Sequence, residues 1–530
     1  MRRSIYTIAI FLFSISVYGQ SAQPSTRNAL LEVFTGISCG WCPEGDQVSA
    51  QLSRLYPQQL FVVDIHAGSY AESGKGTNDY RTTQGDSIHD YYYSLTQGGF
   101  GYPCGLINRS NLNGNWAAYR SEWGDLVSEV ITQNASVDLQ ATAQYDGNTR
   151  LLTVNVEGRS LAESLTGNQR LGVALTQDGI IGPQNGVYNG DSYVHNHVLR
   201  TYLTSAFGDS IGTFSANQTF QRSYSYTVPD YIKEVPVVPE NLNVIVFVAN
   251  QEGEIEQVVG IKPTYINYRE TLAGSLSEPD IPIGNRYGYN FFEVKLNNKS
   301  AQQLTSATFD VTVNGNTTQQ RVDVDIDQFA TQQIRVPATL SYADKGRTKY
   351  SLVLTKLNDE TVDSDTLSGA FNKPKVVGST ITLQMMTDEA ASENHFYLKD
   401  ADGNVVKEFG PFENGIAATY YDTVSVDDGG VYCVEVTDQA GNGLNSGQRG
   451  GLITRSATGS LIDQYYQING YGTRSFFIAD DATAIRQLSP ISSDSSVSYF
   501  TLDGRRVNAP TTPGAYIIRR NQTAKIIIKH

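Results

Sequence analysis

The stretch TGISCGWCPEGD, residues 35–46, holds Cys39 and Cys42, two of the four cysteines in the chain. It follows the apolar run NALLEVFTG (28–36) and precedes a second run, LFVVDIHAG (60–68). Short apolar runs that end in glycine are typical of buried parallel strands. The stretch therefore predicts a strand–helix–strand unit in which the cysteine pair opens the helix. Between the runs, apolar residues recur at helical spacing, at Val48, Leu52, Leu55 and Tyr56.

Two cysteines three positions apart at a helix start suit a redox centre, a structural disulfide or part of a metal site. Unpaired N–H groups and the helix dipole would favour the thiolate of Cys39. An accessible Cys39 would then attack a partner's sulfur, and Cys42 would resolve the mixed disulfide. Trp41 offers an apolar surface for an extended substrate. A disulfide that closes so small a loop adds little stability, which disfavours a purely structural role.

The segment SCGWCPEGD, between a strand and a helix, resembles the active site of the thioredoxin fold. GFGYPCGLINR (99–109) resembles the cis-proline loop of that fold, with Pro103 facing the cysteine pair. The resemblance implies thiol–disulfide oxidoreductase activity in which Pro103 orients the substrate backbone. In two respects the chain departs from the pattern, because Val33 stands where thioredoxins usually keep a buried carboxylate, and Cys104 directly follows the proline. The resemblance places Cys104 close to Cys39, among the substrate-orienting residues.

A soft metal is the alternative at this sheet edge. Three sulfurs and one imidazole suit Cu(I) or Zn²⁺. The candidate ligands are Cys39, Cys42, Cys104 and His66. The simpler interpretation is a loop histidine beside a packed thiol.

Two further motifs hold weaker metal candidates. In DSYVHNHVLRTYL, His195 and His197 stand two apart and would share one face of a strand. In TDQAGNG, Asp438 and Asn442 offer oxygen ligands of the kind that Ca²⁺ accepts. Hydrogen-bonded surface histidines and an ordinary polar turn are the simpler interpretations. Calcium thus joins Cu(I) and Zn²⁺ among the metals that the sequence suggests, and no metal site is firmly predicted.

The histidine phrase, with the preceding LGVALTQDGIIG (171–182), resembles an outer-membrane protein family of Bacteroidetes-type Gram-negative bacteria. That family is named for a mass near twenty-eight kilodaltons. In it a thioredoxin-like region precedes a β-sandwich. The resemblance extends over about residues 28–263 and implies architecture and location more than a specific activity.

The rest of the chain changes from helical to strand-like periodicity. A second amphipathic helix is expected from Trp116, with Trp123 and Val127 on its apolar face. From about residue 135 the pattern alternates, and ASVDLQATAQYDGNTRLLTVNVEG predicts two strands around a Gly-Asn turn. The predicted fold is multidomain, with an N-terminal α/β thioredoxin-like domain followed by several all-β sandwich domains. The expected units are 27–134 (thioredoxin-like), 135–265 (sandwich of the outer-membrane family), 285–372 (Ig-like), 376–480 (jelly-roll-like) and 483–530 (sorting domain).

The N-terminus and the net charge bear on location and partners. Residues 1–19 have the charged start and short apolar run of a secretory signal peptide. No later apolar run reaches the roughly eighteen residues of a membrane span. A formal net charge of −15 argues against a nucleic-acid partner, which would need a basic face. The mature protein is therefore expected to be secreted.

The tail YFTLDGRRVNAPTTPGAYIIRRNQTAKIIIKH (499–530) reads as four strands with Asp-Gly and Pro-Gly turns. It resembles the C-terminal sorting domain read by the type IX secretion system. That resemblance implies the secretion machinery as a partner and the outer cell surface as the destination. The matching sorting residues include Gly504, Arg505, Pro513, Gly514 and Tyr516.

These patterns predict an exported cell-surface protein that carries out thiol–disulfide exchange on exported proteins, with Cys39 and Cys42 as the catalytic pair. The alternative is a non-catalytic surface binding or adhesion protein. In that case the sandwich units would bind surface ligands, and the thioredoxin-like head would be a scaffold.

Overall fold

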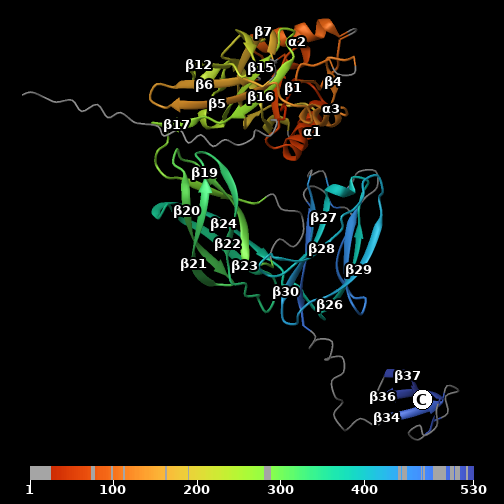
Figure 1. Ribbon diagram of the computed structural model, residues 1–530. Helices are drawn as coiled ribbons and strands as arrows, with labels where there is room; N and C mark the ends of the chain where they lie inside the picture. Colours follow the sequence, from red (N-terminus) through yellow and green to blue (C-terminus); the bar gives the residue numbers. More distant parts are fainter. Residues whose placement is uncertain are drawn as a thin grey trace, which may run out of the picture.

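The computed structural model describes residues 26–72, 78–96, 99–111, 114–161, 164–188, 190–279, 288–439, 443–444, 450–466, 468, 472–480, 497–501, 506–507, 514–520 and 523–529. Across these ranges the chain is mostly β, with many sheets and a few helices near its N-terminal side (Figure 1). It is multidomain and β-rich, in agreement with the coarse prediction. The predicted signal peptide lies outside the described residues.

The N-terminal region is an α/β arrangement in which four strands lie in the order β2-β1-β3-β4. β1 is parallel to β2 and antiparallel to β3, and β3 is antiparallel to β4. Side chains of α1 and α3 pack on one face of this sheet, whereas α2 packs on the other. The elements are β1 (Ala29–Thr35), α1 (Cys42–Leu55), β2 (Leu60–His66), α2 (Thr83–Leu95), β3 (Cys104–Ile107), β4 (Ala118–Tyr119) and α3 (Trp123–Ile131).

The two predicted helices are present, with a shifted start for the second. α1 has Pro43 in its first turn, where a missing N–H costs nothing, and Arg54 in its last turn, near the negative end of the helix dipole. α3 begins at Trp123 and not at Trp116, because β4 occupies the residues between them. The structure adds α2, which the sequence analysis did not predict.

The same sheet continues into the region that the sequence assigned to a separate sandwich. β10 lies beside β2 in a short parallel pairing, with Val198 opposite Asp64, and the sheet then continues through β7, β15 and β16. β11 pairs with β7 off this path. The predicted division at residue 135 therefore runs through one nine-stranded sheet. These strands are β7 (Ser164–Gln177), β10 (Val198–Tyr202), β11 (Asp209–Ser215), β15 (Leu242–Ala249) and β16 (Ile255–Ile261).

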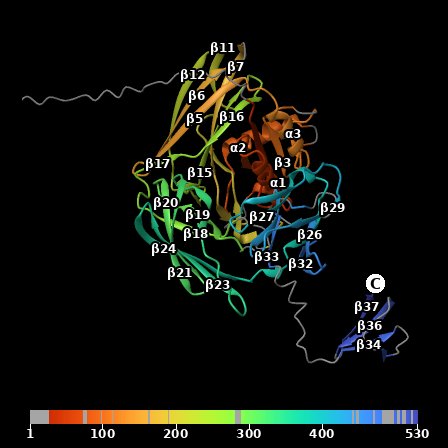
Figure 2. The ribbon, with the colours of Figure 1, turned by 60° about the horizontal axis from the view of Figure 1, so that its bottom comes forward.

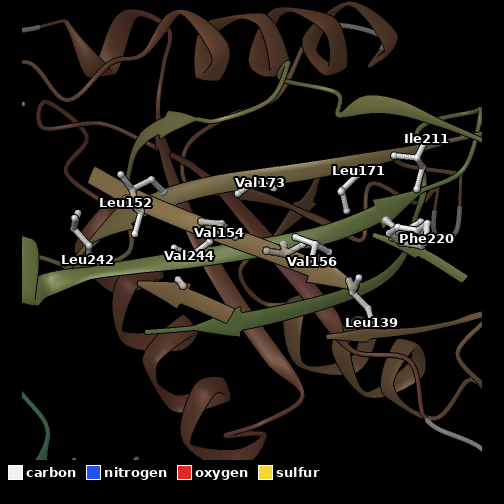
Figure 3. Packing of buried hydrophobic residues seen from close by; sticks show 14 of the residues in the cluster. Leu139, Leu152, Val154, Val156, Leu171, Val173, Ile211, Phe220, Leu242 and Val244 are labelled. Atoms are coloured by element: carbon white, nitrogen blue, oxygen red, sulfur yellow. The ribbon is translucent and has the colours of Figure 1, made fainter. Parts of the chain in front are cut away.

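A second sheet, in the order β12-β6-β5-β17, covers this extension. Its strands are β5 (Val137–Asp146), β6 (Leu151–Ser160), β12 (Thr219–Thr227) and β17 (Thr264–Ile266). β5 and β6 form the predicted hairpin. Figure 3 shows the core between the sheets, where Val154 and Val156 of β6 lie close to Val173 and Val244 of the long sheet. Two short pairs join β8 (Ile180–Gly182) to β9 (Tyr193–His195) and β13 (Tyr231–Ile232) to β14 (Val235–Pro236).

The next unit is a sandwich of a three-stranded and a four-stranded sheet, in the orders β18-β19-β22 and β21-β20-β23-β24. Apolar side chains from both sheets form one buried core. The strands are β18 (Gly274–Ser277), β19 (Phe291–Asn298), β20 (Leu304–Val313), β21 (Asn316–Ile326), β22 (Thr331–Pro337), β23 (Thr348–Leu357) and β24 (Glu360–Phe371).

The third β-unit has two sheets, in the orders β25-β33-β30-β27-β28 and β29-β26-β31-β32, around a separate core. In both views the β26–β29 sheet lies on the side of this unit away from β20 and β24 (Figures 1 and 2). The strands are β25 (Lys375–Val377), β26 (Thr380–Met386), β27 (Asn394–Lys399), β28 (Val405–Phe409), β29 (Thr419–Ser425), β30 (Val431–Asp438), β31 (Gly451–Ser456), β32 (Leu461–Tyr465) and β33 (Gly472–Ala479).

The tail contains four strands in one antiparallel sheet, in the order β35-β34-β36-β37. Gly514 begins β36, and Tyr516 pairs with Ile527 across to β37. The other sorting residues named from the sequence, Gly504, Arg505 and Pro513, lie outside the described residues. The strands are β34 (Val497–Thr501), β35 (Arg506–Val507), β36 (Gly514–Arg520) and β37 (Thr523–Lys529). Among the helices described here, none has the length and apolar composition of a membrane span.

Candidate redox site

The cysteine pair lies at the junction between β1 and α1. Cys39 and Cys42 form a disulfide, and their Cα atoms are 5.5 Å apart. α1 begins at Cys42, so Cys39 precedes the helix. Cys39 lies in a turn that follows β1, in which its N–H donates to Gly36 O at 3.0 Å. The exposed fractions of Cys39 and Cys42 are 2% and 1%. The accessible sulfur expected at Cys39 is therefore not observed in this state.

Trp41, between the two cysteines, is the exposed side chain of the motif, with 66% of its surface accessible. The Arg120 guanidinium lies 5.5 Å from the Trp41 ring centroid, and Arg120 Nη2 donates to Glu44 Oε2 at 2.8 Å. A guanidinium over an indole face adds about 0.5–1 kcal/mol at an exposed position. Trp41 thus presents a flat apolar surface immediately beside the disulfide.

Pro103 meets the first turn of α1. The Tyr102–Pro103 peptide bond is cis. A Cβ atom added to Gly45 would lie 2.7 Å from Pro103 Cγ, so only glycine permits this contact. The structure therefore brings the prolyl loop and the opening of the cysteine-bearing helix together.

A segment from the β-rich region, residues 183–188, lies along residues 36–40; we call it the covering segment. The N–H of Asn185 donates to Ile37 O at 2.8 Å, and Gln184 Nε2 donates to Cys39 O at 2.9 Å. A Cβ atom added to Gly186 would lie 2.1 Å from the carbonyl oxygen of Gly40, so the two backbones are in direct contact. This segment, from more than 140 residues further along the chain, packs over the cysteine loop.

Two acidic residues lie near each other at the N-terminal part of α1, the half-buried Asp46 on the helix itself and the buried Asp64 on β2. Asp46 follows Cys42 by four residues, so both lie on the same face of the helix. Burial raises the pKa of Asp46 to about 6, although the Tyr193 hydroxyl donates to its Oδ2 at 2.6 Å. Asp64 of β2 is opposite Val33 in the parallel register. Burial, and then the nearby Asp46, raise the pKa of Asp64 well above its usual value.

The histidines do not form the predicted pairs. His195 ends β9 and is buried, and its Nε2 donates to Pro183 O at 3.2 Å. His197 lies beyond the strand with φ +55°, and its Nδ1 is 3.4 Å from Asp178 Oδ1. The backbone changes direction between the two residues, so their rings contact different neighbours. The prediction that His195 and His197 share one face of a strand is therefore wrong.

His66 instead lies against the His195 ring, with centroids 5.7 Å apart. Burial lowers the pKa of His66 to about 3 and that of His195 to about 4, so both rings are neutral near pH 7. Tyr80 packs against both of them. The four aromatic rings in contact here are His66, Tyr80, Tyr193 and His195.

Cys104 is buried on the α2 face of the sheet. It lies opposite Phe34 in the β1–β3 register and packs in the same core as Ile88 and Tyr92 of α2. Because α1 packs on the opposite face, the predicted trio of sulfurs does not form. Burial raises the pKa of the Cys104 thiol far above its usual value. Cys433 is likewise a buried free cysteine.

Among the described residues, the structure does not bring the predicted metal ligands together. Across the described ranges, no group of three or more His, Cys, Asp or Glu residues could hold a metal ion. In the proposed calcium loop, Asp438 Oδ2 accepts the N–H of Gly443 at 2.9 Å, which is the bond of a polar turn. Asn442 lies outside the described residues.

Sequence reasoning missed several residues around the disulfide. Asp64 had a visible signal, because a carboxylate in the middle of the apolar run LFVVDIHAG is unusual in a buried strand. Asp46 had a weaker one, its spacing of four from Cys42. Gln184 and Gly186 had none, because only the tertiary fold brings their loop to the cysteines.

Comparisons with known proteins agree with part of this picture. Residues 89–265 match the family model described as outer membrane protein Omp28. This match is one third of the chain, 177 of 530 residues, and begins in α2, after the two cysteines. No curated protein matches the sequence at the level required.

Solved structures give distant likenesses. HBP35 of Porphyromonas gingivalis aligns at 16% identity with a TM-score of 0.38, over 64% of this chain and 98% of that one. A domain of the outer membrane lipoprotein Omp28 from Porphyromonas gingivalis aligns at 24% identity with a TM-score of 0.19, over 25% of this chain and 90% of that one. These scores are too low to carry a functional argument. Residues 89–265, which include the covering segment, thus match the Omp28 outer membrane protein family model, so the resemblance predicted from the histidine phrase is confirmed over that region.

Proposed function

We propose that this protein acts at the outer cell surface, where a thioredoxin-like head exchanges disulfides with exported polypeptides through Cys39 and Cys42. The strand order β2-β1-β3-β4, with α1 and α3 on one face and α2 on the other, supports a thioredoxin-like head. The Omp28 family match supports the location. The proposed route runs through a signal peptide and the C-terminal sorting tail.

One observation carries the exchange proposal. Pro103 packs on Gly45 in the first turn of α1, so the prolyl loop and the Cys39–Cys42 disulfide meet at the same end of the sheet. A substrate backbone that lies along the prolyl loop would present its sulfur to this disulfide. Trp41, exposed beside it, would hold the neighbouring part of the substrate.

The chemistry balances between the protein disulfide and a substrate dithiol. A substrate thiolate attacks Cys39 Sγ, the Cys39–Cys42 bond breaks, and its electron pair leaves on Cys42 Sγ, which takes up a proton. The second substrate thiolate then attacks the substrate sulfur of the mixed disulfide and releases Cys39 as a thiolate. The substrate is oxidised to a disulfide and the protein is reduced to a dithiol. In reverse, Cys39 attacks and Cys42 resolves.

In this proposal, the carboxyl groups of Asp46 and Asp64 exchange the proton that Cys42 takes up or gives away. Asp46 lies on the same helix face as Cys42, and its pKa near 6 permits it to give and take a proton close to neutral pH. Asp64 contributes a second buried carboxyl from β2, opposite Val33. In this proposal, Asp64 of the neighbouring strand β2 takes the place of the buried carboxylate that thioredoxins usually keep at the position of Val33.

The test is turnover of a disulfide-bonded polypeptide, with insulin reduction and disulfide isomerisation as the two readouts. The wild type should be active, Cys39→Ser should be inactive, and Cys104→Ala should retain activity because Cys104 lies on the opposite face. Activity that persists in Cys39→Ser would reject the mechanism.

The burial of both sulfurs favours a second candidate, a non-catalytic surface or adhesion protein in which the head is a scaffold and the disulfide is inert. This candidate predicts no turnover in the wild type and none in variants whose disulfide is uncovered. It also predicts that Cys39→Ser binds surface ligands as tightly as the wild type.

A further inference from the structure

The covering segment, residues 183–188, lies along the loop that carries Cys39, and both cysteines of the disulfide are buried. We propose that this segment is a gate, which closes on residues 36–40 in the state described here and must swing away before the disulfide exchanges. The gate deepens the proposed function and rests on exchange at this disulfide. In the closed position it would also protect the disulfide from small thiols.

The contacts of the gate form a row along the cysteine loop. Gln184 Nε2 donates to Gly36 O at 3.3 Å and to Cys39 O at 2.9 Å. Asn185 donates from its N–H to Ile37 O at 2.8 Å and from Nδ2 to Ser38 O at 3.3 Å. Carbonyls of four successive residues, 36–39, thus accept hydrogen bonds from the segment. Water or an extended polypeptide could satisfy the same carbonyls once the gate opens.

The burial pattern shows that the gate is not part of the hydrophobic core. Within residues 183–188, Gln184 alone is buried, and it is polar; Tyr188 is 96% exposed. Opening would therefore expose little apolar surface, whereas displacing α1 would expose Leu52 and the core beneath it. Segments with few buried apolar contacts are the ones that open locally while the rest of a protein stays folded.

The first residues of the gate, Pro183 and Gln184, are also hydrogen-bonded to residues outside the cysteine loop. β8 pairs with β9 just before the segment, and His195 Nε2 holds Pro183 O at 3.2 Å. The N–H of Gln184 donates to Gly190 O at 2.8 Å on the return. Movement can therefore be confined to the loop while β8 and β9 stay paired.

Two substitutions should weaken closure by different routes. Gly186→Ala places a Cβ atom 2.1 Å from Gly40 O at a residue with φ +89°, so the segment must move off the loop. Gln184→Ala removes the bonds to Gly36 O and Cys39 O without adding bulk. The matched control for the first is Gly212→Ala, which has φ +92° and open space around its Cβ position. The control for the second is Gln319→Ala, an exposed residue bonded to Asp310.

The experiment measures the rate at which excess dithiothreitol reduces the disulfide in the folded, full-length protein. Samples are acid-quenched and denatured, and new thiols are counted by mass after alkylation. Reduction of the wild type should be at least about tenfold slower than in its urea-unfolded form. Gly186→Ala and Gln184→Ala should each be at least about tenfold faster than the wild type, with both controls within about twofold. If either gate variant fails to fold, the other carries the test.

Three results would overturn the gate. Equal reduction rates in the wild type and both gate variants would do so, as would a wild-type rate equal to that of the unfolded chain. So would equal acceleration by Gly212→Ala, which would indicate general destabilisation. The outcome is separable from that of the proposed function, because dithiothreitol reports access alone. Gate variants that are reduced quickly but never turn over a polypeptide would reject exchange and keep the gate.

Discussion

Glu32 and Arg109 form an ion pair in which both side chains are completely excluded from solvent. Arg109 Nε and Nη2 each donate to one Glu32 carboxylate oxygen at 2.6 Å. The Tyr202 hydroxyl donates to Glu32 Oε1 at 3.0 Å. The three residues come from β1, the turn that follows β3, and β10, so the pair joins the α/β region to the strand that extends its sheet.

Loss of this pair should destabilise the protein strongly. In Arg109→Met the Glu32 carboxylate stays buried without its cation, and we expect the free energy of unfolding to fall by about 3–5 kcal/mol. Urea unfolding followed by circular dichroism measures the change. The control, Arg159→Met, breaks a partly exposed pair with Asp138 and should cost less than about 1 kcal/mol. Equal losses in the two variants would contradict the assignment.

Asp46 should make stability fall as the pH rises. Its pKa is about 6 in the folded protein against 3.8 for the free group, so between about pH 4 and 6 the folded state holds a proton that the unfolded chain has lost. At about 1.4 kcal/mol per pKa unit, Asp46→Asn should be more stable than the wild type by about 2–3 kcal/mol at pH 8 and similar at pH 4. Urea unfolding at both pH values tests this. The exposed Asp230→Asn is the control and should show no such difference.

Arg474 should couple the second and third β-units. Its Nη1 donates to Glu293 Oε2 of β19 at 2.7 Å, and its Nε bonds Glu435 of β30, which also pairs with Lys399. Arg474→Leu leaves buried carboxylates without this cation, so we expect a loss of about 3–5 kcal/mol and two calorimetric transitions where the wild type has one for these units. Arg455→Leu, in the same unit, is the control. A single unshifted transition in Arg474→Leu would refute the coupling.

Trp41 should matter for substrates and little for stability. Because its side chain is 66% exposed, Trp41→Ala should change the free energy of unfolding by less than about 1 kcal/mol. Exchange with a polypeptide substrate should slow, whereas reduction by dithiothreitol should not. Tyr231→Ala, at a residue 62% exposed, is the control. Polypeptide exchange that is unaffected in Trp41→Ala would remove its role in substrate binding.

Local patterns predicted the elements well. The runs before Gly36 and Gly68 became the parallel pair β1 and β2, and the alternation after residue 135 became the β5–β6 hairpin. In each case the signal was the periodicity of burial on one element. α2 was missed because its buried positions include Gly85 and His89, which do not read as apolar. Its spacing, with Ile88 and Tyr92, is nevertheless helical.

The surroundings of the disulfide were less predictable. The motif did predict that Cys39 pairs with Cys42 and that Pro103 lies at the same end of the sheet. Both features were predictable because each residue lies at the end of a recognisable element. Gln184 and Gly186 contact the backbone of the cysteine loop, and no periodicity in the sequence reveals their tertiary position. Cys104 was misplaced because its side-chain direction depends on the β1–β3 register, and a shift of one residue reverses the face.

The nine-stranded sheet also sets the order in which the chain can finish folding. The free edge of β2 has no neighbour until β10 has emerged, since Val198 is the residue that pairs beside Asp64. An uncovered strand edge is a template for mispairing with other chains. The sheet of the cysteine-bearing half is therefore incomplete until the half that follows it has been made. We therefore expect this edge to need protection by a chaperone during the interval before β10 arrives.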